Sequence, residues 1–167
     1  CALPIFEAAY KSLRFNDVGR IAIDIYQEDI KINKYERDIR RKVLAHLATT
    51  PTKDLVFGLI LISIVIDIER IGDYTKNIVE LAKAHPKALH AGPIEDTLAD
   101  IEQKVDERFR LLQSAFEKLD AEAARSIMKD HRANTQRCDQ IVESLIKEEY
   151  PDFTPGEATA IGMYARY

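Results

Sequence analysis

The segment from Leu55 to Ile66 is almost unbroken apolar sequence, and it constrains the fold more than any other part of the chain. It is too short to span a bilayer, which takes about 20 apolar residues. A helix that is apolar on every side is stable in water only where other elements cover it. The segment therefore predicts a buried core helix in a helical protein rather than a membrane-spanning helix.

The composition fits that prediction. The 167-residue chain is 46% hydrophobic and 31% charged, which is typical of a soluble globular protein. Its net charge of −4 argues against nucleic-acid binding, which usually needs a basic face. Cys1 and Cys138 match no metal or redox spacing and favour a reducing compartment such as the cytoplasm. Because the chain begins with a cysteine, we expect its natural start to lie upstream.

Helical periodicity fills nearly the whole chain, and strand-like alternation is almost absent. Residues that commonly cap helices precede four of the periodic segments: Asn16, Thr50, Asp120 and Thr154. A proline follows two of these caps directly, which is typical of a first helical turn. We expect helices over about residues 4–15, 17–47, 51–84, 94–119, 121–150 and 155–167.

The order of these helices repeats. A helix, a long helix, a Thr-Pro start and a third helix occur twice, with the first helix shorter than its counterpart. A shift of 102 positions pairs core-type residues of the two halves. Three helices joined by short loops pack best as an antiparallel bundle. The sequence therefore predicts an all-α protein of two tandem three-helix bundles, at residues 1–86 and 93–167. The second bundle stops partway through its last helix.

Two carboxylates follow the apolar segment one helical turn apart. Glu69 and Asp73 lie on the same helix face, where like charges repel and where burial disfavours ionisation. A bound cation would offset both penalties. The alternative is a solvated polar helix end in which Arg70 and Lys76 neutralise the acids. Spacing alone leaves both interpretations open.

A second group of polar residues is expected at the same height in the bundle. Asp29 lies about as far before the short loop near residue 50 as Glu69 lies after it, so at about 1.5 Å per residue the two are level. Asn33 and Glu36 follow Asp29 by one and two turns. Such an oxygen-rich cluster suits Mg, Mn or Fe and, less well, Zn. The alternative is ordinary helix surface, since Lys31, Lys34 and Arg37 lie nearby. The helix glycine Gly72 indicates the close approach of a neighbouring helix.

These segments resemble a known family. The sequence DIERIGD at residues 67–73 follows an apolar run that starts with Pro51, Asp54 and Leu55, and Asn77–Ile78 follows it. This pattern resembles the third-helix signature of PhoU proteins. The sequence DIKIN at residues 29–33, with Glu36, is similar to the second-helix pattern of the same family.

The resemblance implies a cytoplasmic regulator of phosphate uptake without catalytic activity. Its expected partners are a phosphate ABC transporter, through which it would be peripheral to the membrane, and the sensor histidine kinase of the phosphate regulon. A homodimer is also expected. Members carry divalent or trivalent metals such as Fe, Zn, Mn or Ni. The implied metal ligands are Glu69, Asp73, Asp29 and Asn33. Further candidates are Glu36, Asp130 and His131. The shift of 102 positions places His131 opposite Asp29.

Two alternatives were compared with this expectation. Similar domains form cytosolic regulatory parts of sodium–phosphate cotransporters and other ion transporters. In that alternative the chain has the same fold but is the regulatory domain of a transporter. A di-iron carboxylate oxidase would need Glu-x-x-His pairs. No histidine of this chain has a glutamate three residues before it, which argues against that enzyme class.

Overall fold

All regular secondary structure of the described residues is helical, and the sequence-based prediction of an all-α fold is confirmed. The computed structural model describes residues 2–16, 24–50, 53–85 and 87–167. It contains six α-helices and one short 3₁₀ helix: α1 (Ala2–Phe15), α2 (Ile25–Thr49), α3 (Leu55–Ala84), η1 (Gly92–Ile94), α4 (Glu95–Lys118), α5 (Ala121–Ile146) and α6 (Pro155–Arg166). None of the helices in these ranges is both long enough and apolar enough to cross a membrane.

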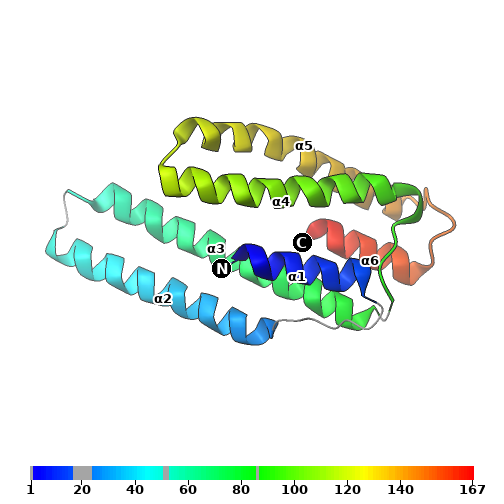
Figure 1. Ribbon diagram of the computed structural model, residues 1–167, viewed down its shortest axis with the longest axis horizontal. Helices are drawn as coiled ribbons and strands as arrows, with labels where there is room; N and C mark the ends of the chain where they lie inside the picture. The colour runs from blue at the N-terminus through cyan, green and yellow to red at the C-terminus, as the bar shows by residue number, and fades with distance from the viewer. Residues whose placement is uncertain (1, 17–23, 51–52, 86) are drawn as a thin grey trace.

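The helices form two groups of three. Helices α1 and α2 both pack on α3, and α4 and α6 both pack on α5. Contacts of α1 with α4 and of α3 with α6 join the groups, and one cluster of buried side chains runs through both. The long hairpins α2–α3 and α4–α5 reach further to the left in Figure 1 than the shorter α1 and α6. The division into units at residues 1–86 and 93–167 stays a prediction.

Two of the four predicted helix caps are correct. Asp120 accepts hydrogen bonds from the backbone amides of the first turn of α5. Thr154 forms a capping box with Glu157 at the start of α6. The prediction at Asn16 is wrong: Asp24 caps α2, and residues 17–23 of the expected helix lie outside the described part of the chain.

The prediction at Thr50 is also wrong. Thr50 ends α2, because its amide and its hydroxyl both donate to the carbonyl of His46. Helix α3 starts later, after Asp54.

Helices α2 and α3 approach each other closely at two glycines, as predicted for Gly72. A Cβ atom on Gly72 would lie 3.1 Å from the Cδ1 atom of Ile32. A Cβ atom on Gly58 would lie 2.8 Å from the Cδ1 atom of Leu47. The absence of side chains at these two positions lets α2 lie along α3, and this brings the polar residues of the two helices together.

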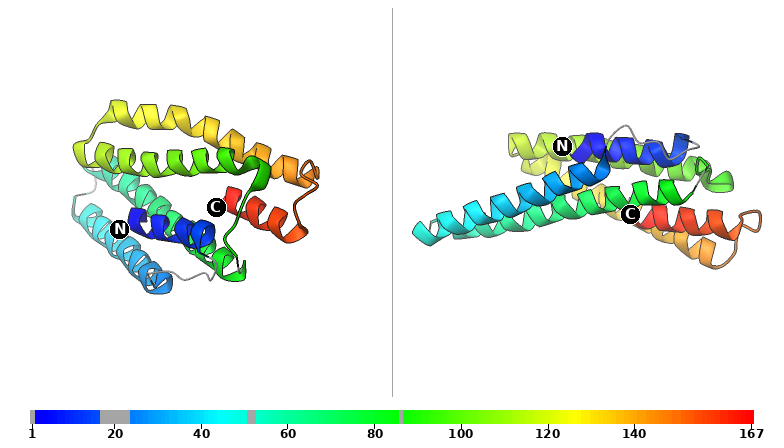
Figure 2. Two further views of the ribbon diagram at one scale, coloured as in Figure 1. Left: turned by 45° about the vertical axis from the view of Figure 1, so that its right-hand side comes forward. Right: turned by 90° about the horizontal axis from the view of Figure 1, so that it is seen from below.

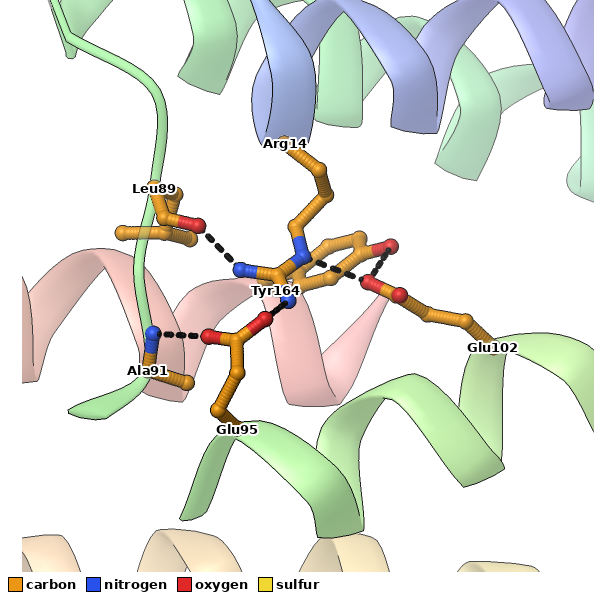
Figure 3. A network of polar contacts seen from close by, with 6 residues as sticks. All are labelled: Arg14, Leu89, Ala91, Glu95, Glu102 and Tyr164. Atoms are coloured by element: carbon orange, nitrogen blue, oxygen red, sulfur yellow. Dashed lines mark hydrogen bonds and ion pairs between the residues drawn. The ribbon is translucent and has the colours of Figure 1, made fainter. Parts of the chain in front are cut away.

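A buried polar network joins the two helix groups (Figure 3). Arg14 of α1 is only 3% exposed, and its guanidinium donates to the carbonyl of Leu89 and to the carboxylates of Glu95 and Glu102 on α4. The Tyr164 hydroxyl of α6 donates to the same Glu102 oxygen at 2.8 Å. Burial raises the pKa of Glu102 and of Tyr164. The Arg14 guanidinium therefore connects α1 with α4 and with the linker between α3 and η1. Through Glu102 it is also connected to Tyr164 of α6.

The first half of α3 is helical as predicted, but most of its large apolar side chains are exposed rather than buried. Phe57 is 70% exposed, and Leu55, Val56, Leu59 and Ile60 are exposed as well. In the described structure α1 lies along the second half of α3 (Figures 1 and 2).

Candidate functional site

The predicted acidic residues of α2 and α3 come together around one lysine. Lys76 of α3 lies with its Nζ atom 3.1 Å from a carboxylate oxygen of Asp73 and 3.5 Å from one of Asp29 across the helix pair. Hydrogen bonding to Asp73 and the negative charge of Asp29 raise the pKa of Lys76 against the opposing effect of burial. The lysine is therefore the cation that bridges the two helices at this point.

Glu69 is the least compensated member of the cluster. Burial raises the pKa of its carboxyl group, and the charge of Asp73 raises it further. Glu36 and Asp29 add to this repulsion, and Lys76 offsets only part of it. The charges of Asp29, Glu36 and Asp73 thus all act on the Glu69 carboxyl group, which agrees with the height match inferred from the sequence.

Two further candidates on α2 make local contacts. The side-chain amide of Asn33 donates to the backbone carbonyl of Asp29 at 3.0 Å. Glu36 accepts a hydrogen bond from Arg40 at 2.6 Å, one turn further along the same helix. Arg70, the other expected neutralising residue, faces Asp67 at 3.8 Å rather than the cluster.

The carboxylate and amide oxygens of the cluster are chemically suited to a hard cation. The ammonium group of Lys76 lies where such a cation would place its charge. Carboxylate and amide oxygens are the ligands that Mg²⁺, Mn²⁺ and iron prefer. Burial is the largest cause of the raised pKa of Glu69; the neighbouring carboxylates raise this pKa further, and Lys76 lowers it. Within the described residues, however, no three His, Cys, Asp or Glu side chains stand close enough together to hold a metal ion. In this arrangement the ammonium group occupies the place of a cation.

The candidates of the second helix group lie elsewhere. His131 is on α5, exposed, with its ring 3.5 Å from the hydroxyl of Thr135. Asp130 belongs to α5, but its side chain lies outside the described part of the structure. Cys138 is a half-buried free thiol whose pKa is raised by burial, and Cys1 lies outside the described residues. The correspondence of His131 with Asp29 by the shift of 102 stays a prediction.

Sequence analysis missed the Arg14 network entirely. Arg14 stands in the last turn of α1, where a basic residue is common and attracts no notice. Its partners are 75 to 88 positions away in sequence, so no local spacing indicates them. The only available signal was an arginine among apolar residues of an amphipathic helix.

Comparison with known proteins identifies the first helix group. Residues 2–82 match the PhoU domain, a range that includes α1, α2 and nearly all of α3 with the acidic cluster. No curated protein and no solved structure matches the chain. The matched range, the three-helix arrangement and the acidic motif of α3 agree with one another. The resemblance to PhoU proteins inferred from the sequence is therefore confirmed for residues 2–82.

Proposed function

We propose that the protein is a regulator of phosphate uptake and phosphate-regulon signalling, acting in the cytoplasm as a metal-binding adaptor between a phosphate ABC transporter and a sensor histidine kinase. The observation that supports this proposal is the PhoU domain at residues 2–82, in a family of phosphate-transport regulators rather than enzymes. The proposal assigns the chain no catalytic step.

In this proposal the cluster between α2 and α3 holds a cation. Asp29, Glu69 and Asp73 would supply carboxylate oxygens, and Asn33 would supply an amide oxygen. A divalent ion would place two positive charges where Lys76 now places one. A cation bound only in the folded state stabilises that state by linkage, so it would tie α2 to α3 and stiffen the hairpin.

The partner assignment can be tested with membranes that contain a phosphate ABC transporter and a phosphate-responsive sensor kinase. Tagged full-length chain, loaded with Mn²⁺, is expected to co-purify with both proteins. The double variant Glu69→Gln/Asp73→Asn should lose most of this binding. Asp67→Asn is the matched control, because Asp67 is on the same helix, is exposed and contacts only Arg70 among the described ion pairs.

The results separate two parts of the proposal. If the wild-type chain co-purifies with neither partner, the adaptor assignment is overturned. If the wild-type chain and the double variant both co-purify with both partners, the adaptor role stands. The acidic cluster then has no role in binding these partners.

A further inference from the structure

The end of the α2–α3 hairpin protrudes from the molecule and is apolar. It reaches further along the long axis than the turn between α4 and α5 (Figure 1; Figure 2, right). Near the start of α3, Leu55, Val56 and Leu59 are 46%, 71% and 54% exposed. Leu44 of α2 is 60% exposed. Large apolar side chains are therefore open to solvent at a protruding end.

The stripe that begins with Leu55 and Leu59 lies on the side of α3 away from α1. Spacings of three and four continue it through Ile66 to Glu69 of the acidic cluster. Ala82 is buried in the half of α3 along which α1 lies, and it falls about half a turn away from this stripe. A helix in line with α1 therefore leaves Leu55 and Leu59 open.

The adjoining face of α2 is basic. Its residues recur at i, i+3, i+4 and i+7 and therefore share one side of the helix: Arg37, Arg40, Arg41 and Leu44. Arg37 follows Asn33 by one turn, so this face is on the same side of the hairpin as the α3 stripe. Residues 34–57 contain six Lys or Arg and three Asp or Glu, whereas the whole chain has a net charge of −4. The positive charge is thus local to this end.

We propose that this hairpin end binds the surface of an anionic lipid membrane. Its apolar part is Leu44, Leu55, Val56 and Leu59, and its basic rim is Arg37, Arg40, Arg41 and Lys53. Leu44 and Leu59 lie within about 8 Å of the hairpin ends of their helices, which matches the depth of about 5–10 Å to which interfacial helices bury apolar side chains. Arg41 lies about 12 Å from the end of α2, so its long side chain can reach the lipid phosphates.

Charge and shape favour a membrane over other apolar occupants. Anionic lipid attracts the basic end and repels the acidic remainder, which orients the molecule with the hairpin end towards the lipid. A convex end enters a flat lipid surface without any matching partner shape. Asp29 lies about 30 Å from the end of α2, beyond the screening length of about 8 Å, so the acidic cluster does not oppose this contact. The inference goes beyond the adaptor role and does not depend on metal binding.

Co-sedimentation of the full chain with lipid vesicles tests the proposal. One set of vesicles contains equal parts of phosphatidylglycerol and phosphatidylcholine, and the other contains phosphatidylcholine alone. The wild-type chain is expected to bind the anionic vesicles at about 0.1 M salt and to be released at about 1 M, because salt screens the attraction. Binding to the neutral vesicles should be much weaker.

A first pair of variants tests the apolar side chains. Val56→Gln/Leu59→Gln should lower the vesicle partition coefficient about tenfold or more, because less apolar surface enters the lipid. Both residues are exposed and glutamine is a good helix former, so the circular dichroism spectrum should stay unchanged. Met128→Gln/Ile146→Gln is the matched control, because both residues are on α5 and are 75% and 76% exposed.

A second pair tests the basic rim. Arg37→Gln/Arg41→Gln should lower binding to anionic vesicles about tenfold or more and weaken its salt dependence, because two cations no longer face the lipid phosphates. Arg125→Gln/Arg132→Gln is the matched control. It removes two exposed arginines from α5 and gives the protein the same net charge as the first double variant.

The proposal is overturned if the wild-type chain does not bind anionic vesicles, or binds neutral vesicles equally well. It is also overturned if either matched control lowers binding as much as its test variant. A wild-type dimer that Val56→Gln/Leu59→Gln converts to a monomer in light scattering, without vesicle binding, would assign the hairpin end to a second copy. Because the vesicles contain no protein, these results are separate from the test of the transporter and the kinase.

Discussion

At the residue scale, Lys76 decides how the acidic cluster behaves. Its ammonium group pairs with Asp29 and Asp73, while Glu69 keeps a raised pKa. A cation entering the cluster must therefore repel or displace this lysine. The sequence offered two interpretations, a cation site and a self-neutralised polar patch. The structure shows the lysine contact of the second, and the cation site remains a proposal.

The first prediction concerns this competition. Lys76→Gln should raise the affinity for Mn²⁺ by about tenfold, since it removes a positive charge a few ångströms from the incoming ion. The metal-free protein should lose about 1 kcal/mol of stability or less, the usual size for an exposed ion pair. Isothermal titration calorimetry and urea unfolding measure the two effects.

Lys31→Gln is the control, because Lys31 is exposed on α2 and pairs with Glu28 outside the cluster. An equal Mn²⁺ affinity in wild type and Lys76→Gln would show that Lys76 does not compete with the ion.

At the element scale, local chemistry explains which helix boundaries were predictable. Thr154 and Thr50 both precede a proline, yet only Thr154 caps a helix. The difference was visible in the sequence: Glu157 stands three residues after Thr154 and completes the capping box, whereas Lys53 stands three residues after Thr50. A Thr-Pro pair therefore indicates a helix start most strongly where an acidic partner follows three residues after the threonine.

The second prediction follows from this difference. Thr154→Ala should lower the free energy of unfolding by about 1 kcal/mol, because it removes the hydrogen bond that the hydroxyl accepts from the amide of Glu157. Thr50→Ala should change it by less than about 0.5 kcal/mol, since Thr50 is an exposed residue at a helix end. Equal losses in thermal or urea unfolding would contradict the assignment of the caps.

The helices and the acidic cluster could be predicted because both depend on short-range spacing. Periodicity gave the helices, and the short loop near residue 50 placed Asp29 level with Glu69. The exposure of Phe57 could not be predicted, because it depends on which part of α3 the other helices cover. The network around Arg14 could not be predicted either, because it joins residues that only the packing of α1 on α4 brings together.

At the scale of the whole molecule, Arg14 holds the two helix groups in one arrangement. Its guanidinium contacts the linker and two carboxylates of α4, and Tyr164 of α6 reaches one of them. Removing one partner of a buried ion pair leaves a charge without compensation. The network therefore makes the relative placement of the groups sensitive to a single residue.

The third prediction is that Arg14→Met costs about 3–5 kcal/mol of stability, because it leaves Glu102 buried and unpaired. Adding Glu102→Gln should restore part of the loss, since glutamine carries no charge and can still accept from Tyr164. Urea unfolding of the two variants gives the comparison. A double variant less stable than Arg14→Met would contradict this account of the network.

The fourth prediction concerns pH. Burial acts to raise the pKa of Glu95, but hydrogen bonds from the Ala91 amide and from Arg14 bring it below the ordinary value of 4.5. A carboxyl whose pKa is lower in the folded state stabilises the protein above its unfolded pKa, and this stability is lost as the pH falls through the folded pKa. The stability difference between wild type and Glu95→Gln should therefore be present at pH 7 and disappear below the ordinary glutamate pKa. A difference that persists at pH 3 would contradict the role of the Glu95 charge.

The central claim is that the cluster between α2 and α3 binds a metal ion, and metal content tests it most directly. Elemental analysis after dialysis against Mn²⁺ or Fe²⁺ should find bound metal in the wild-type chain and in the control Asp67→Ala. Glu69→Ala/Asp73→Ala should have lost it. Equal metal content in the wild type and in the double variant would contradict the claim.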